Sequence, residues 1–325
     1  MDRKPPLRDQ VHALLEYVTS LIRARNTQVL QARPLSHYMA LLDEYPTLAA
    51  LGYSSPQVQR ACGEISGMIG DDGLDLYHRA LLLSLILRAM SVLPDRNLPE
   101  EIKVRFEDNF ARITSDIETS IGQQVSYIYV SSPFCKDLAI CTLRLIPVGV
   151  AKVHSYHLPR RMFLAGLRGA SKAFRFVVLE RGGLSPYYDT HMHSQDPQAM
   201  AEFGAEGWVN FYTRIAELLR RNPQMKGLAG STWLHDPILA TISPHLAILH
   251  DVQINNGAHL FLLGPCNANS IKDATMKSST RRRLYEEGKY IPTEYCIVWP
   301  RDALIAWADS RLEVPPATPR LHTPA

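Results

Sequence analysis

Apolar residues recur at spacings of three and four over much of the first third of the chain. The stretch 11–24, VHALLEYVTSLIRA, follows this helical period. The stretch 75–93, DLYHRALLLSLILRAMSVL, is apolar on nearly every side, as the central helix of a bundle is. Pro56 and Pro99 are typical of helix starts, and two acidic residues follow Pro99. The pattern predicts a helical region over residues 1–121.

The pattern changes after residue 121 to short stretches rich in β-branched residues. The predicted strands are 123–130, 138–153, 174–180, 185–193, 226–234, 258–264 and 293–300. The predicted helices between the later strands are 197–224, 236–249 (interrupted at Pro244) and 278–288. This order predicts an α+β chain in which an antiparallel meander precedes alternating helices and strands over residues 122–311. The proline-rich residues 312–325 are expected to be a disordered tail.

Within the predicted helix 197–224, one face collects large apolar residues. They are Trp208, Phe211, Ile215, Leu218 and Leu219. Such a stripe is typical of a helix packed on a core.

Composition and charge indicate which kinds of partner and which cellular compartment to expect. The chain has 325 residues, 46% of them hydrophobic and 21% charged, with a net charge of +3, which gives no sign of a nucleic-acid partner. The five cysteines form no CxxC pair, so free thiols in a reducing cytoplasm are expected. The longest apolar run, 80–90, contains Arg88 and is too short to span a bilayer. We therefore expect a soluble cytoplasmic protein without a membrane partner.

One strand carries the most distinctive polar pattern. Asp189, His191 and His193 occupy alternate positions, so they share one face of a β-strand. Two imidazoles and a carboxylate are the ligands of a non-haem iron site. A histidine that titrates near neutrality also suits acid–base catalysis. A polar strand face without chemistry is the third interpretation, and the sequence leaves all three open.

A second polar group lies at the end of the predicted strand 226–234, where α/β folds place ligands. It consists of Ser231, Thr232, Trp233, His235 and Asp236. The alternative is packing, with Asp236 as the cap of the next helix.

Three arginines, Arg281–Arg283, open the predicted helix 278–288. They could hold a phosphate, but a solvated helix face is the favoured interpretation.

The order of elements after residue 122 resembles the GNAT acyltransferase superfamily. The most specific likeness lies in RRRLYEEGKYIPTEYCIVWPR, residues 281–301, which resembles the family's closing helix, hairpin and strand. The matching residues are Leu284, Tyr285, Glu286, Gly288 and Tyr290. The resemblance implies that Tyr285 donates a proton to the departing CoA thiolate. It also implies a glycine-rich phosphate loop, expected around 234–240, where LHDPILA has no glycine.

Together these features favour an acyltransferase. It would move an acyl group from a CoA or carrier-protein thioester to a small amine, with Asp189 and His191 or His193 on the basic side and Tyr285 as the acid. Ser231, Thr232 and Trp233 would bind the acyl-CoA or acyl-carrier thioester. The alternatives are an iron-dependent oxygenase that uses Asp189, His191 and His193, and a ligand-binding protein without catalysis.

Overall fold

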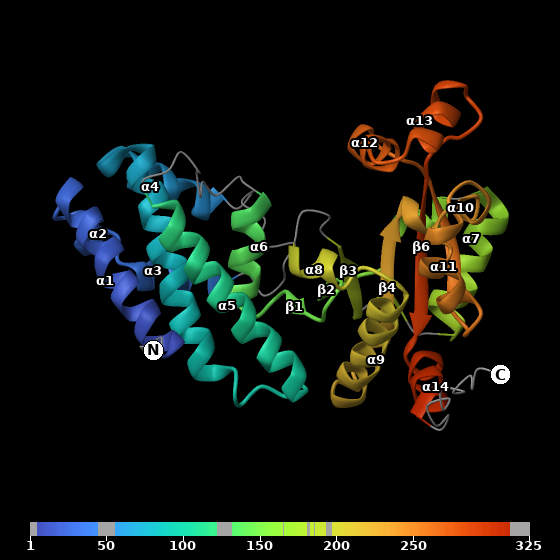
Figure 1. Ribbon diagram of the computed structural model, residues 1–325, viewed down its shortest axis with the longest axis horizontal. Helices are drawn as coiled ribbons and strands as arrows, with labels where there is room; N and C mark the ends of the chain where they lie inside the picture. Colours follow the sequence, from blue (N-terminus) through green and yellow to red (C-terminus); the bar gives the residue numbers. More distant parts are fainter. Residues whose placement is uncertain are drawn as a thin grey trace, which may run out of the picture. The chain divides into compact units, whose positions relative to one another are not determined.

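The structure is a computed structural model that describes residues 5–44, 56–121, 132–164, 166–180, 183–184, 186–192 and 197–312. The chain divides into two compact units, Met1–Ser155 and Tyr156–Ala325 (Figure 1). The predicted strand 123–130, His193 and residues 313–325 of the predicted tail lie outside the described residues.

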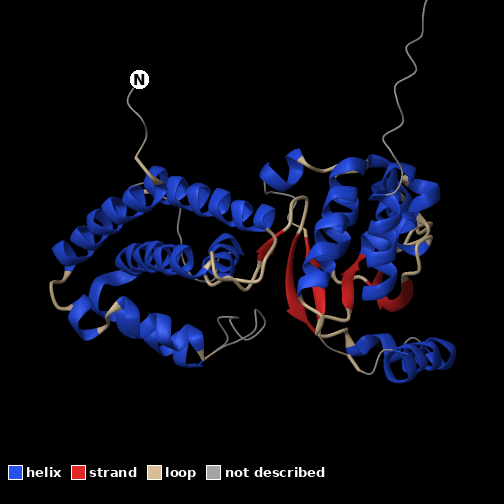
Figure 2. Ribbon diagram, turned by 90° about the horizontal axis from the view of Figure 1, so that it is seen from below, coloured by secondary structure: helices blue, strands red, loops and turns tan. Residues whose placement is uncertain are grey.

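The first unit is built mainly from helices, as its apolar periodicity predicts (Figure 2). Its elements are α1 (Leu7–Arg25), α2 (Val29–Ala32), α3 (Leu35–Asp43), α4 (Pro56–Val92), α5 (Glu100–Ser120), α6 (Ser132–Cys141), β1 (Ile146–Pro147) and β2 (Lys152–Tyr156). Helices α1 and α3 pack along α4, and β1 and β2 form a short antiparallel hairpin.

Helix α4 supplies the core of this unit. The run Leu81–Leu83 is completely buried, as are Leu85 and Ile86. The helix begins at Pro56, as predicted, and breaks at Gly70, whose φ of 72° lies in the left-handed region that glycine tolerates. Two helical segments therefore meet at a kink at Gly70.

The second unit contains a mixed sheet covered by helices on both faces. The elements before β4 are η1 (Arg160–Leu164), α7 (Gly166–Phe174), η2 (Arg175–Glu180), β3 (Tyr187–His191), α8 (Pro197–Ala201) and α9 (Ala205–Arg221). Those from β4 to β5 are β4 (Gly227–Thr232), η3 (Trp233–His235), α10 (Leu239–Ile242), η4 (Pro244–Leu246), α11 (Ile248–Ile254) and β5 (His259–Pro265). The last are α12 (Ala268–Met276), α13 (Ser279–Glu286), β6 (Thr293–Pro300) and α14 (Arg301–Leu312).

The strands of this unit lie in the order β3-β4-β6-β5. Strands β3 and β4 are parallel, whereas β4 with β6 and β6 with β5 are antiparallel. With the helices of the first unit, this mixed sheet confirms the predicted α+β class.

Side-chain alternation gives the sheet two apolar faces. One face packs under η1, α7 and η2, and its core includes Tyr187, Ala229, Phe261, Cys296 and Val298. The other face packs under α9, α11 and α14. There Tyr212 contacts Trp299 and Trp307 edge to face, and the predicted apolar stripe of α9 is buried.

The predicted strand at 174–180 is wrong, because this stretch ends α7 and continues as the π-helical turn η2. The buried residues Ala173, Phe176 and Val177 are spaced three and four apart, while Phe174 is 54% exposed. The burial period is thus helical, and the local β-branched composition was overridden by packing on the sheet.

Three further differences concern helices. Residues 138–141, predicted as part of a strand, form the end of α6. Helices α12 and α14 were not predicted at all.

None of the helices in the described residues combines the length and apolar character that crossing a membrane requires.

Candidate functional site

The site begins where the pairing of the parallel strands β3 and β4 ends. Strands β3 and β4 are in register at Tyr188–Leu228 and Asp189–Ala229. Beyond that point β4 continues to pair with β6 as far as Thr232, but its register with β3 ends. At the end of the paired segment, the Thr190 hydroxyl donates a hydrogen bond to the Ala229 carbonyl oxygen (3.0 Å).

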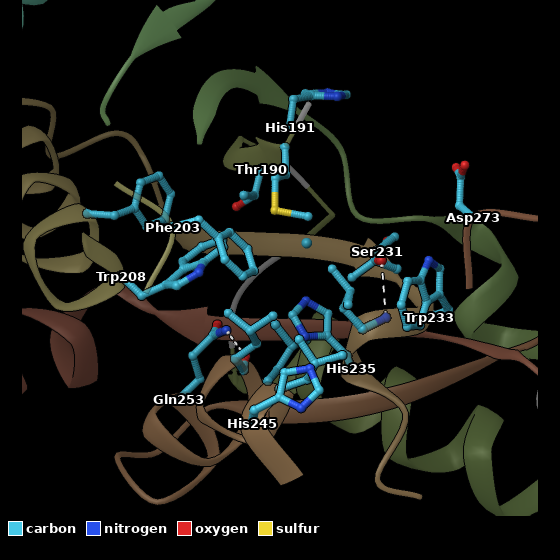
Figure 3. Close-up of a pocket in the computed structure, with 18 of the residues that line it drawn as sticks. Thr190, His191, Phe203, Trp208, Ser231, Trp233, His235, His245, Gln253 and Asp273 are labelled. Carbon is cyan, nitrogen blue, oxygen red and sulfur yellow. Dashed lines mark hydrogen bonds between the residues drawn. The ribbon is translucent and has the colours of Figure 1, made fainter. Parts of the chain in front are cut away.

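A cavity of about 530 Å³ opens at this divergence (Figure 3). It lies at the carboxyl ends of the two parallel strands, which is the usual ligand position in open α/β sheets. Its lining comes from β3, β4, β6, α8, α9, α11, η3, η4 and the α12–α13 segment.

One end of the cavity is apolar and aromatic. Its side chains include Phe203, Trp208 and Phe211, and Trp208 packs against both of the other two rings. In Figure 3, Phe203 and Trp208 lie together at this end, while Ser231, Trp233 and Asp273 lie at the other. The cavity therefore has an apolar end and a polar end.

Strand β3, which carries the alternating acid and histidines, lines the cavity partly with other residues than predicted. Thr190 and Met192, the residues between the predicted ones, line the cavity. Asp189 shares the opposite face of the sheet with Tyr187. His191 reaches the cavity wall but is directed away from the other labelled side chains (Figure 3).

Asp189 and His191 do come together, as the strand spacing predicts. His191 Nε2 lies 3.6 Å from Asp189 Oδ2, and the two side chains are 46% and 23% exposed. Burial raises the pKa of Asp189 to about 7, although the backbone N–H of Thr190 lowers it in part. A carboxyl that titrates near neutrality can take up and release a proton under physiological conditions.

A metal at this place would need ligands in addition to Asp189 and His191. The predicted third ligand, His193, lies outside the described residues. The iron-site hypothesis therefore stays a prediction.

Ser231, Thr232 and Trp233 all line the cavity. The Thr232 hydroxyl accepts a hydrogen bond from the Leu234 N–H (3.2 Å), which starts the turn η3 and directs Trp233 to the cavity wall. Asp236 accepts from the Ile238 N–H (3.2 Å), so its carboxylate acts in the local turn, as the packing alternative proposed.

His235, which the sequence places in the same group, also lines the cavity. A Cβ on Gly230 would lie 3.3 Å from His235 Nε2, so the glycine leaves room for the imidazole beside the opened strand. His235 is buried, and its Nδ1 has no hydrogen-bond partner among the described residues. Burial, with a smaller effect of His250, lowers the pKa of His235 to about 3. The imidazole is thus neutral and available for one hydrogen bond.

The arginine cluster separates into one buried and two exposed side chains. Arg281 is 5% exposed and lines the cavity, contrary to the favoured interpretation of a solvated face, whereas Arg282 and Arg283 are exposed. Tyr285, the predicted acid, is 39% exposed on α13 and does not belong to the cavity lining. Its catalytic role stays a prediction.

The start of α9 also borders the cavity through Trp208, and Phe203, just before the helix, lines it as well. Its N-cap, Gly204, offers no side-chain cap. Gly207 is sterically required, since a Cβ there would overlap the carbonyl oxygen of Glu202. The helix therefore begins with backbone N–H groups that no capping side chain satisfies.

Comparison with known proteins finds distant likenesses only. No family model matches the chain, and no curated protein matches it. The chain is similar to the structure of an acyltransferase in complex with decanoyl-CoA at 11% identity and a TM-score of 0.43, covering 88% of this chain and 99% of that one. With the same coverage, it is similar to an acyltransferase in complex with decanoyl-CoA and teicoplanin at 14% identity and a TM-score of 0.40. At these values the likeness gives no evidence about the function of this chain.

Proposed function

We propose that the second unit transfers an acyl group from a CoA or carrier-protein thioester to a small amine. The observation that carries this proposal is the opening of β3 from β4 onto the cavity of about 530 Å³. A cavity of this size falls in the range of small-molecule sites, roughly 300–1,000 Å³.

The opened edge of β4 suits the arm of such a thioester. Over Ser231–Thr232, β4 stays paired with β6, whereas its register with β3 ends at Asp189–Ala229 and Thr190 still lies beside Gly230. A pantetheine arm is extended and carries two amides, so it can pair with this edge as an added strand does. The arm would thereby bring the thioester between the two strands.

The apolar end of the cavity suits the acyl chain. Phe203, Trp208 and Phe211 surround it, and Trp208 packs against both Phe203 and Phe211 with ring centroids 6.4 and 5.3 Å apart. Burying a methylene group there would contribute about 0.8 kcal/mol.

The resemblance to GNAT enzymes implies an anion cradle at a helix N-terminus. The start of α9 borders the apolar end of the cavity, which this proposal gives to the acyl chain, so the phosphates of a CoA donor would lie away from it. The segment 234–240, where the sequence suggested the loop, instead forms η3 and the beginning of α10. The carboxylate of Glu206 in the first turn of α9 would repel an anion at this helix start. Carrier-bound thioesters therefore belong among the donors to be tested.

The base in this proposal is His191, which lines the cavity and forms a pair with Asp189, whose Oδ2 lies 3.6 Å from the imidazole Nε2. The amine nitrogen attacks the thioester carbonyl carbon, the C–S bond breaks, and the ammonium proton passes to this pair. The leaving thiolate takes up one proton, which balances the reaction. Asp189, whose pKa burial raises to about 7, can take this proton on from His191.

Binding of a thioester tests the proposal. Acyl-CoA or acyl-carrier protein should raise the melting temperature of the wild-type protein, because a ligand of the native state stabilises it. Gly230→Val should abolish the shift, since a side chain there would fill the space beside His235 and Thr190. Gly67→Ala, at an open position of the first unit, is the control. The absence of any shift across acyl-CoAs of several lengths and an acyl-carrier protein would refute the proposal.

A further inference from the structure

The polar end of the cavity contains a buried positive charge. Arg281 is 95% buried, and its guanidinium lies over the ring of Trp233, 5.1 Å from the centroid. Nε donates to the Ala274 carbonyl (2.6 Å), and a terminal nitrogen donates to the Ser243 hydroxyl (2.7 Å). All three partners are neutral.

No carboxylate among the described residues forms an ion pair with Arg281. Asp273 lines the same end of the cavity on α12, but it is exposed and makes no ion pair with Arg281. Burial lowers the pKa of Arg281, with Tyr290 acting in the opposite direction, yet a guanidinium stays protonated in proteins. Buried charges in folded proteins are normally paired, so this one lacks its counterion.

A second cation accompanies it. Lys277, at the end of α12, lines the same end of the cavity and is exposed. The hydroxyl-bearing Ser278, which caps α13 by accepting from the Arg281 N–H (3.2 Å), also belongs to the lining. The arrangement offers a guanidinium fork, an ammonium group and a hydroxyl at one end of a cavity whose other end is aromatic.

We propose that Arg281, with Lys277, forms an anion subsite that binds a carboxylate or phosphate group of the cavity's ligand. The ligand is then amphipathic, with its apolar part beside Trp208 and its oxyanion beside Arg281. Arginine suits this task because its planar fork matches the two oxygens of such a group. The inference requires the cavity to be a ligand site and does not require the thioester.

Binding of two matched probes tests the subsite. Octanoate and octanamide share the chain and differ in charge, and calorimetry measures both affinities. The wild-type protein should bind octanoate about tenfold or more tightly than octanamide, as expected for a charge-assisted hydrogen bond in a desolvated site. Arg281→Gln should abolish this preference. Arg283→Gln should retain it, because it removes the same charge from an exposed pair with Glu287 on the same helix.

Two measurements guard against a variant that fails to fold. In the wild-type protein, inorganic phosphate should compete with octanoate and leave octanamide binding unchanged. Lys277→Gln, at an exposed position, should weaken octanoate binding by a smaller factor than the loss of Arg281. Equal affinity of the wild-type protein for the two probes, or a preference that survives in folded Arg281→Gln, would overturn the inference.

The source of the anion follows from two thioester probes. If Arg281→Gln weakens binding of octanoyl-CoA but not of octanoyl-pantetheine, the subsite binds a phosphate of the donor. If both affinities are unchanged while the octanoate preference is lost, the subsite binds an anionic group of the acceptor. If neither thioester binds the wild-type protein and the octanoate preference stands, acyl transfer is refuted and the anion subsite is retained.

Discussion

Replacing Asp189 by Asn should make the second unit more stable at alkaline pH and leave it unchanged in acid. The pKa of Asp189 rises from 3.8 to about 7 in the folded protein. Between these values the folded state binds more protons than the unfolded chain, so this carboxyl lowers the free energy of unfolding as pH rises from about 4 to about 7. Asn has no such titration.

The size of the effect follows from the same values. A tenfold change in an ionisation constant corresponds to about 1.4 kcal/mol, so the ionised carboxylate costs the folded state at most about 4 kcal/mol above pH 8. The side chain is 23% exposed and faces His191, and both features reduce the cost. We therefore expect Asp189→Asn to gain about 2 kcal/mol at high pH, with water screening part of the maximum.

Urea unfolding followed by tryptophan fluorescence measures this gain. All four tryptophans of the chain, at positions 208, 233, 299 and 307, belong to the second unit, so the signal reports on that unit alone. Asp273→Asn, an exposed carboxylate of the same unit, is the control and should show no pH-dependent difference from wild type.

A gain that does not vary with pH would refute the reasoning. So would a loss of stability near pH 6, because that sign would mean that Asp189 is held as an ion by protonated His191 and not destabilised by burial. The same substitution tests whether Asp189 takes the proton on from His191, since loss of a group in acid–base catalysis lowers turnover by about 10²–10⁴-fold.

Three further substitutions test other parts of the site. Gly207→Ala should destabilise the start of α9 by about 1–3 kcal/mol, because the new Cβ overlaps the Glu202 carbonyl, and a fall in melting temperature measures it; an unchanged melting temperature would mean that the helix start yields freely. Tyr285→Phe should lower turnover by about 10²–10⁴-fold if this tyrosine is the acid, whereas full turnover would assign it to the surface of α13. Combined His191→Ala and His193→Ala should abolish bound iron or zinc, as metal analysis shows, if the strand is a metal site; wild-type protein that neither contains metal nor takes up Fe(II) would exclude the oxygenase hypothesis.

Local patterns predicted several elements. The stripe of α9 was recognised from its helical period, and the strands β4, β5 and β6 were recognised from short runs of apolar and β-branched residues, although burial in β4 and β6 is continuous. Helix α13 was predicted over 278–288 and forms over Ser279–Glu286, with Ser278 as its N-cap. The stretch 174–180 failed because its β-branched residues pack in a helical period on the sheet.

The cavity could not be predicted, since it depends on which strands are neighbours. The divergence of β3 from β4 joins residues about forty positions apart, and no local pattern records it. Alternation correctly placed Asp189 beside His191, but it could not show that the cavity lies on the side of Thr190. The sequence could not distinguish Arg281 from its exposed neighbours, because Arg281 is buried by contacts with Trp233 and Ser243, which belong to other elements.

The connection between β5 and β6 has a consequence for how this protein can diversify. These strands are antiparallel neighbours, so a tight turn would suffice to join them. The chain instead makes an excursion through residues 266–292, which forms α12 and α13 at the end of the sheet where β4 ends (Figure 1). This excursion supplies Lys277 and Arg281 to the cavity but adds no strand to the sheet. Exchanging it between related chains would change which head group the cavity selects while the strands and their core stay intact, so selectivity can evolve as a separate module.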